Sequence, residues 1–190
     1  MSNATPVSIC SNALLKLGGK SFSDFSEKRD QVTLAANLFP SVRDSVLRSH
    51  PWKCALRRVL LSPLTEAPAF DFQAQFELPA DWLRTVQVGR EGCTIPFRTE
   101  GTRILANVTA LPLVYVFRNE VPGTYSSNLV GVMEQAMAAA MCYPVTTSTT
   151  LRDSMIAELD RMMKVAKAVD GQDDPPEEFA EGSFVESRFS

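Results

Sequence analysis

The chain holds one histidine, His50, which is the first residue to consider for proton-transfer chemistry because its ordinary pKa lies near neutral pH. His50 directly precedes Pro51, and a residue before proline is pushed out of the helical region, so it stands at a predicted helix end. A histidine there more commonly caps carbonyls or packs at an interface than acts in catalysis. The sequence also lacks a glycine-rich phosphate loop and a nucleophile elbow.

Four carboxylates in the middle of the chain could include the pair that a glycoside hydrolase uses as acid and base or nucleophile. They are Asp71, Glu77, Asp81 and Glu100. Acids in a small β domain more often form a solvated face. Asp81 follows a proline closely, which favours a turn or capping role. We therefore expect no catalytic site, and a hydrolase remains the alternative.

Four cysteines are scattered along the chain without a Cys-x-x-Cys pair: Cys10, Cys54, Cys93 and Cys142. Because zinc sites in proteins use three or four nitrogen, sulfur or carboxylate ligands, often in closely spaced pairs, one histidine and dispersed cysteines do not favour a metal site. We expect reduced, mostly buried thiols, with no metal and no cofactor.

The densest positive cluster lies in and after a predicted long helix and consists of Arg43, Arg48, Lys53, Arg57 and Arg58. On a helix, Arg43 and Arg48 point about 140° apart, so they do not form one DNA-binding stripe. Asp44 is adjacent to Arg43 and is not expected to face it. An ion pair of Asp44 should therefore involve another element or another subunit.

Hydrophobic periodicity predicts two helices at the start of the chain and two near its end. The first runs from about Pro6 to Leu17 with Thr5 as its N-cap, and the second from Ser26 to Ser49, where Pro40 should kink it. The third starts at Ser126 or Ser127 and ends near Pro144. The fourth spans about 150–169, with Thr150-x-x-Asp153 as a capping box.

Between these helices the pattern changes to that of short strands. Apolar residues alternate with polar ones from Phe70 to Leu78, and Leu113 to Phe117 is rich in β-forming residues. Glycines at 89, 92 and 101 mark turns. We expect an α+β fold, mainly α: a four-helix bundle with an inserted small antiparallel β domain and an extended acidic C-terminal tail. The predicted boundaries are 1–54 and 123–170 for the two helical halves, 55–122 for the insert and 171–190 for the tail.

Four motifs in order along the chain carry a resemblance to a known family. The main one is Pro40-x-x-Arg43-Asp44-x-x-Leu47-Arg48-x-x-Pro51-Trp52, and a second is Leu78-Pro79-Ala80-Asp81-Trp82-Leu83-Arg84. The others are an N-terminal helix that ends in Leu17-Gly18 and a closing helical pair from Met133 to Val169. Over about residues 5–170 the chain resembles the bacteriophage head-to-tail adaptor family, the podovirus tail tubular protein A group. Pro40, Pro51, Trp52, Pro79 and Asp81 are the structural residues of the motifs.

The resemblance implies a structural virion protein rather than an enzyme. Such an adaptor forms a ring of twelve copies under the portal ring, extends the DNA channel and provides the platform for a tail tube or nozzle protein. It is assembled in the host cytoplasm and located at the head-to-tail interface. DNA passes through without specific binding. The resemblance makes contacts between neighbouring subunits the expected role of Arg43, Asp44, Arg48, Arg57 and Arg58.

The C-terminal residues have a different composition from the rest. From Asp170 onwards there are seven acids and one base, so this segment carries −6 and the remainder +3 of the total charge of −3. The segment is too polar to fold alone, so it is either a solubilising tail or a docking strap. We favour the strap, which would contact the portal or a neighbouring subunit through Phe179, Phe184, Arg188 and Phe189.

Two other functions remain as alternatives. One is a virion-associated cell-wall hydrolase that acts during entry, and the other is a free DNA-binding protein of the packaging stage, which a sequence pI of about 5.3 disfavours. A membrane-spanning helix needs about 18 consecutive apolar residues, and no apolar run in the sequence is that long. The N-terminus lacks the features of a signal peptide, and we expect no membrane contact.

Overall fold

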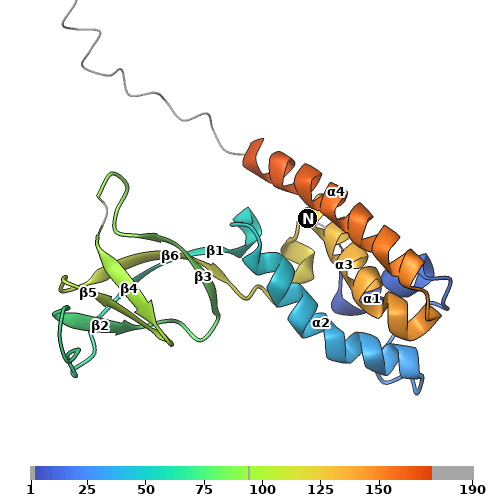
Figure 1. Ribbon diagram of the computed structural model, residues 1–190, viewed down its shortest axis with the longest axis horizontal. Coiled ribbons are helices and arrows are strands. Elements are labelled where there is room, and N and C mark those ends of the chain that lie inside the picture. Colours follow the sequence, from blue (N-terminus) through green and yellow to red (C-terminus); the bar gives the residue numbers. More distant parts are fainter. Residues whose placement is uncertain (1–2, 94, 173–190) are drawn as a thin grey trace, which may run out of the picture.

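The computed structural model describes residues 3–93 and 95–172. These residues form an α+β fold with four α-helices and two small antiparallel sheets. The helices lie together on one side of the molecule and the sheets on the other (Figure 1). The expected insertion of strands between two pairs of helices is therefore confirmed at this level.

Helices α1 and α2 begin the chain. Helix α1 spans Pro6–Lys16, and its N-cap is Thr5, whose hydroxyl accepts from the backbone N–H of Ser8 as a helix start requires. Helix α2 spans Asp30–Arg48 with Pro40 in its interior. Its predicted start at Ser26 was wrong, because residues 23–29 form a loop closed by its own hydrogen bonds, including Ser26 N–H to Asp24 Oδ1 at 2.6 Å.

Six strands follow a short 3₁₀ turn, Lys53–Ala55. One sheet has the order β1-β6-β3 and the other β2-β5-β4, with every pair antiparallel. Their bounds are Leu56–Leu61 (β1), Ala74–Glu77 (β2), Trp82–Val88 (β3), Phe97–Glu100 (β4), Arg103–Ala106 (β5) and Leu111–Phe117 (β6). The chain enters this part through β1 and leaves it through β6, which are paired neighbours.

The strand predicted from Phe70 to Leu78 is shorter in the structure. Phe70 is 77% exposed, and Asp71 has a φ of 67°, in the left-handed region that interrupts an extended chain. Of this segment, only Ala74–Glu77 pairs with a neighbouring strand. The alternation of apolar and polar residues therefore predicted too long a strand.

Helices α3 (Ser127–Thr146) and α4 (Thr149–Gln172) follow a second 3₁₀ turn, Pro122–Thr124. Ser126 caps α3 as predicted, but the helix continues past Pro144 to Thr146, two residues beyond its expected end. The carbonyl that Pro144 leaves without a helical donor belongs to the exposed Ala140, where water can reach it. The predicted capping box of α4 was wrong, because the hydroxyl that accepts from Leu151 N–H belongs to Ser148.

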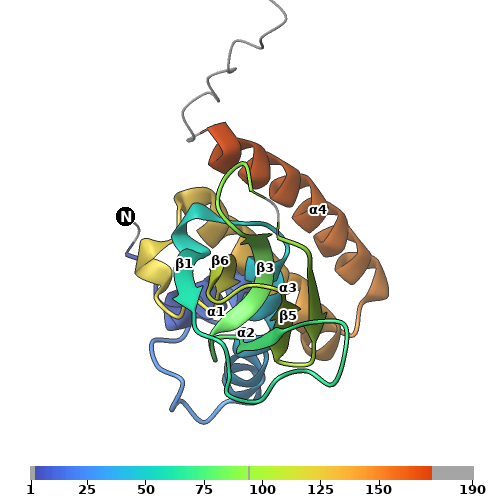
Figure 2. The same cartoon turned by 90° about the vertical axis from the view of Figure 1, so that its left-hand side faces the viewer.

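Helix α3 is the centre of the helical layer and packs against α1, α2 and α4. A Cβ on Gly131 of α3 would lie 3.2 Å from the methyl of Met162, so α3 and α4 approach closely there. The hydrophobic core is divided into two clusters. One joins the four helices and includes Trp52 and Tyr125, and the other lies between the two sheets around Phe76 and Ile104. Seen from the sheet side, the strands stand in front of α1, α2 and α3 (Figure 2).

Candidate functional site

Seven side chains form two hydrogen-bonded groups where the helices meet the first sheet, and a backbone hydrogen bond from Arg118 to Asp81 joins the two groups; we call them together the junction cluster. Its members are Arg43, Asp44, Arg57, Asp81, Tyr115, Arg118 and Glu120. They come from α2, β1, the turn before β3, β6 and the segment after β6. The cluster therefore joins residues that lie far apart in the sequence.

Asp44 is the centre of the part that faces α2. Its Oδ1 accepts from Arg43 Nε and its Oδ2 from Arg118 Nε, each over 2.8 Å. Arg43 is only 8% exposed, and its Nη1 also donates to Glu120 Oε1 over 3.2 Å. A buried guanidinium is costly unless its charge and its donors are matched, and the two carboxylates do this.

The prediction that Asp44 would not face Arg43 was wrong. The argument from spacing considers where two Cβ atoms point, whereas the arginine stem is long enough to bend back to its neighbour. The second half of that prediction was right, because Arg118, from another element, is also a partner of Asp44.

Asp81 is the centre of the part that faces the sheet. Its carboxylate accepts from Arg57 Nη1 and from the hydroxyl of Tyr115, the latter over 3.1 Å. The Arg57 guanidinium also lies over the ring of Phe117, 3.9 Å from its centroid. The backbone is tied here too, since Arg118 N–H donates to Asp81 C=O over 2.7 Å. The predicted turn is present, with Trp82 N–H bonded to Pro79 C=O at 2.9 Å.

The end of α2 contacts β3 directly. Arg48 donates through Nη1 to the backbone carbonyl of Leu83, and its guanidinium lies 5.8 Å from the ring centroid of Trp82. The following Trp52 is fully buried and donates Nε1–H to Val46 C=O over 3.0 Å. Pro51 and Trp52 thus end the helix and fasten its last turn to the core.

The ionisation of the cluster follows from these contacts. The hydrogen bond to Asp44 raises the pKa of Arg118, so the guanidinium keeps its charge. Burial, and then the hydrogen bond to Asp81, raises the pKa of Tyr115, so its hydroxyl stays neutral and remains a donor. These groups therefore keep their charges and hydrogen-bond donors, an arrangement suited to holding the side chains of the cluster in fixed positions.

Arg43, Arg48 and Arg57 therefore all have partners within the chain. Arg58 is exposed on β1, at the free edge of its sheet. A role of these residues between subunits stays a prediction. Phe179, Phe184, Arg188 and Phe189 lie outside the described residues, as does nearly all of the predicted tail; its boundary moves by two residues because α4 extends to Gln172.

His50 lies at the end of α2, as expected. Its ring contacts that of Trp52 edge-on at 4.7 Å between centroids, and its Nε2 is 3.4 Å from Asp170 Oδ2 of α4. Burial lowers the pKa of His50, although Asp170 opposes this effect. The residue thus packs at an interface between helices, one of the two roles that the sequence favoured.

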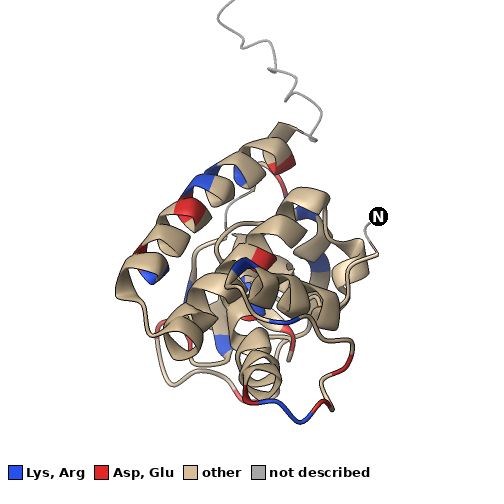
Figure 3. Cartoon of the chain, turned by 90° about the vertical axis from the view of Figure 1, so that its right-hand side faces the viewer, with Lys and Arg blue, Asp and Glu red and all other residues tan. Residues whose placement is uncertain are grey.

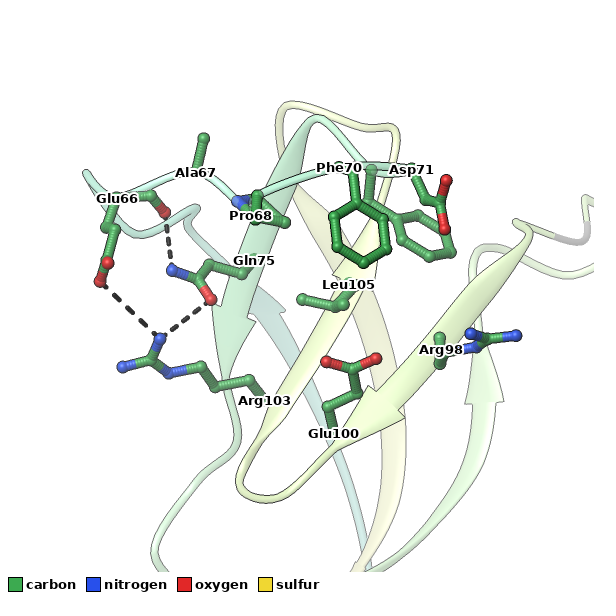
Figure 4. A pocket seen from close by; sticks show the side chains of 12 residues that line it. Glu66, Ala67, Pro68, Phe70, Asp71, Gln75, Arg98, Glu100, Arg103 and Leu105 are labelled. Atoms are coloured by element: carbon green, nitrogen blue, oxygen red, sulfur yellow. Dashed lines mark hydrogen bonds and ion pairs between the residues drawn. The ribbon is translucent and has the colours of Figure 1, made fainter.

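The four candidate carboxylates are not gathered in one place. Asp81 belongs to the junction cluster, and Glu77 lines a separate hollow with Pro79 and Gly101. Asp71 and Glu100 do line one pocket, of about 260 Å³, between the loop before β2 and strands β4 and β5. Figure 4 shows both side chains there, together with Arg98 and with Arg103, which donates to Gln75 Oε1 over 2.9 Å.

Three consecutive residues at the junction were not singled out from the sequence, and neither was Tyr115: the three are Arg118, Asn119 and Glu120. Asn119 donates through Nδ2 to Cys54 C=O and to Thr124 Oγ1, at 2.7 and 2.8 Å, so it fastens the chain where it returns from the sheet. The sequence signal for them is a polar triplet, Arg-Asn-Glu, placed between a β-rich run and a proline.

Within the described residues, no group of three or more histidine, cysteine, aspartate or glutamate side chains is placed to hold a metal ion. No described helix has the length and apolar character needed to cross a bilayer. No family model and no curated protein sequence matches this chain.

Proposed function

We propose that this protein is a structural virion component, a head-to-tail adaptor that forms a ring under the portal and extends the DNA channel. The observation that carries the proposal is the contact between two motifs of the family resemblance, the one that begins at Pro40 and the one that begins at Leu78. Arg48 of the first motif bonds to Leu83 of the second, and Asp44 is linked through Arg118 to Asp81. Residues that are remote in the sequence thus act as one structural unit.

The junction cluster suits this role. A subunit of a closed ring must present two different, complementary patches at a fixed angle, so its parts must not rotate against each other. Charged hydrogen bonds at the junction fix the sheets relative to the helices. The finer parts of the proposal are a four-helix bundle built around α3, a ring of twelve copies and docking of a tail tube or nozzle protein on the opposite side of the adaptor from the portal.

The test is to mix the purified protein with purified portal rings and to image the mixture by electron microscopy. We expect a second ring of matching symmetry below the portal. A chain that ends after Gln172 keeps all of α4 and should fail to attach, because the acidic segment is proposed to reach the portal or a neighbouring subunit. Folded protein that leaves the portal bare would overturn the adaptor proposal, and attachment of the shortened chain would overturn only the role of the tail.

The entry hydrolase remains a second candidate because Asp71 and Glu100 line one pocket. It predicts that the protein degrades peptidoglycan and that Asp71→Asn or Glu100→Gln abolishes this activity while portal attachment is retained. A protein without activity on peptidoglycan would exclude this candidate.

A further inference from the structure

An apolar groove separates α2 from α4 on the surface of the helical layer, and we call it the α2–α4 groove. Its volume is about 310 Å³, and the described residues leave it open. Its walls and floor are formed by Val42, Ser45, Ser49, Leu159, Met163 and Ala136. An apolar cavity of about 150 Å³ is enough to hold benzene, so this groove has room for an aromatic ring.

The last helix brings the C-terminal end of the described chain to one end of the groove. Ser49 Oγ lies 3.7 Å from Met163 Sδ, and further along α4 the Asp170 carboxylate meets His50. Helix α4 then ends at Gln172, and residues 173–190 continue from there. The groove thus lies close to the point where the acidic segment begins.

Positive charge lies between that point and the groove. Lys167 is four residues after Met163 and so shares its helix face, and both Lys167 and Arg84 act electrostatically on His50, which places them around the end of α2. Basic residues follow one another along this part of α4 (Figure 3). The first residues after α4 include four acids, followed directly by a phenylalanine: Asp173, Asp174, Glu177, Glu178 and Phe179.

We propose that residues 173–179 of the same chain fold back over Lys167 and place the ring of Phe179 in the α2–α4 groove beside Met163. The geometry allows this. Seven extended residues beyond Gln172 can span about 23 Å. Along the helix, Met163 lies only about 14 Å from Gln172. The acids then lie against Lys167 and Arg84, and the aromatic ring covers the apolar walls.

The occupant is the chain's own segment rather than that of another copy, because a short tether gives a local concentration in the millimolar range. At ordinary protein concentrations, the tail of a second molecule is too dilute to compete with the chain's own segment for the groove. A partner that binds the segment must first release it from the groove. This inference does not depend on the proposed function, since it concerns the isolated protein.

The experiment is nuclear magnetic resonance of the full chain with ¹³C-labelled methionine methyl groups. An aromatic ring next to Met163 shifts its methyl resonance. We expect Phe179→Leu, and a chain that ends after Gln172, to move this resonance to one common position. Phe184→Leu and Phe189→Leu are the matched controls and should leave it unchanged. Unmoved signals of the buried Met133 and Met137 would show that each variant is folded.

Charge reversal provides an independent test. Lys167→Glu should move the Met163 resonance towards its position in the shortened chain, and dilution of the intact chain should not move it. A Met163 resonance that is the same with and without residues 173–190 would overturn the proposal. A shift that disappears on dilution would mean that the tail of another copy fills the groove, and a response to Phe184→Leu alone would assign the groove to another ring; both results contradict the proposal. None of these measurements involves a portal, so their failure is distinct from failure of the adaptor function.

Discussion

Asp44 and Arg118 lie 74 residues apart in the sequence, and Arg118 Nε donates to Asp44 Oδ2 over 2.8 Å. Between them the chain passes through the whole β part and returns. The same Asp44 carboxylate neutralises the buried Arg43. The Asp44 side chain therefore links α2, which precedes the strands, to the segment that follows the last strand.

Asp44→Asn should destabilise the protein by about 2 kcal/mol, because it removes the charge that faces both Arg43 and Arg118. The free energy of unfolding in urea measures this loss. Glu120→Gln is the matched control: its side chain is 66% exposed, so the loss there should stay below about 1 kcal/mol. Equal losses in the two variants would contradict a central role of Asp44.

Trp52→Phe should cost about 3 kcal/mol, since it removes the hydrogen bond to Val46 and leaves a void in the core. The other tryptophan, Trp82, is only half-buried and bonds to Thr85 Oγ1 over 3.1 Å. Trp82→Phe should therefore cost only about 1 kcal/mol. Unfolding followed by circular dichroism compares the two. A smaller loss at Trp52 than at Trp82 would show that Trp52 does not anchor the end of α2.

His50 should make the protein less stable as the pH falls. Burial lowers its pKa in the folded state, whereas in the unfolded chain it titrates near 6.5. The unfolded state then binds the proton first, so the stability that His50 contributes is present above about pH 6.5 and is lost as the pH falls through the lower folded pKa.

The chain has a single histidine, so a proton resonance titration reads the pKa of His50 without ambiguity. Asp170→Asn should lower this pKa further, because the Asp170 carboxylate favours the protonated ring. A folded-state pKa above 6.5 would reverse the predicted slope of stability against pH.

The four thiols should differ in their reactivity. Cys93 is exposed, whereas burial raises the pKa of Cys10 to about 12 and that of Cys54 to about 11. Because the thiolate is the reactive form, iodoacetamide at pH 8 should modify Cys93 long before Cys10 or Cys54. Mass spectrometry of the peptides as a function of time gives the order. Early modification of Cys10 would mean that α1 opens readily.

The positions of the helices could be predicted because their signals are local. Thr5 and Ser126 are caps that act on the next turn, and the apolar positions of each helix repeat at helical spacing. Exact ends depended on contacts that no local pattern records. A hydrogen-bonded loop occupies the residues before Asp30, so α2 starts later than predicted. Helix α3 continues past Pro144, where the residue that loses its helical donor, Ala140, is exposed.

The junction was predictable only in part. The motifs drew attention to Arg43, Asp44, Arg48 and Asp81, but not to the side chains that each would meet. Arg118 and Tyr115 become partners of the two aspartates through the register of β6 against β1 and β3, which is a long-range property of the sheet. Such pairings are set by the fold as a whole, so no spacing within a motif reveals them.

The entry of the chain into the sheets through β1 and its exit through β6 have an evolutionary consequence. Leu56 and Val116 are direct partners in the ladder, so the two ends of the β part lie about 5 Å apart, no farther than the ends of a hairpin. The hydrophobic cluster of the helical layer takes only Leu83 and Val116 of its buried residues from the strands. An insertion, a deletion or a wholly different hairpin-like module between these two positions would leave the helical frame connected as it is now. Changes of length are therefore tolerated best in the second sheet, β2-β5-β4, while the frame around α3 and the junction cluster stay in place.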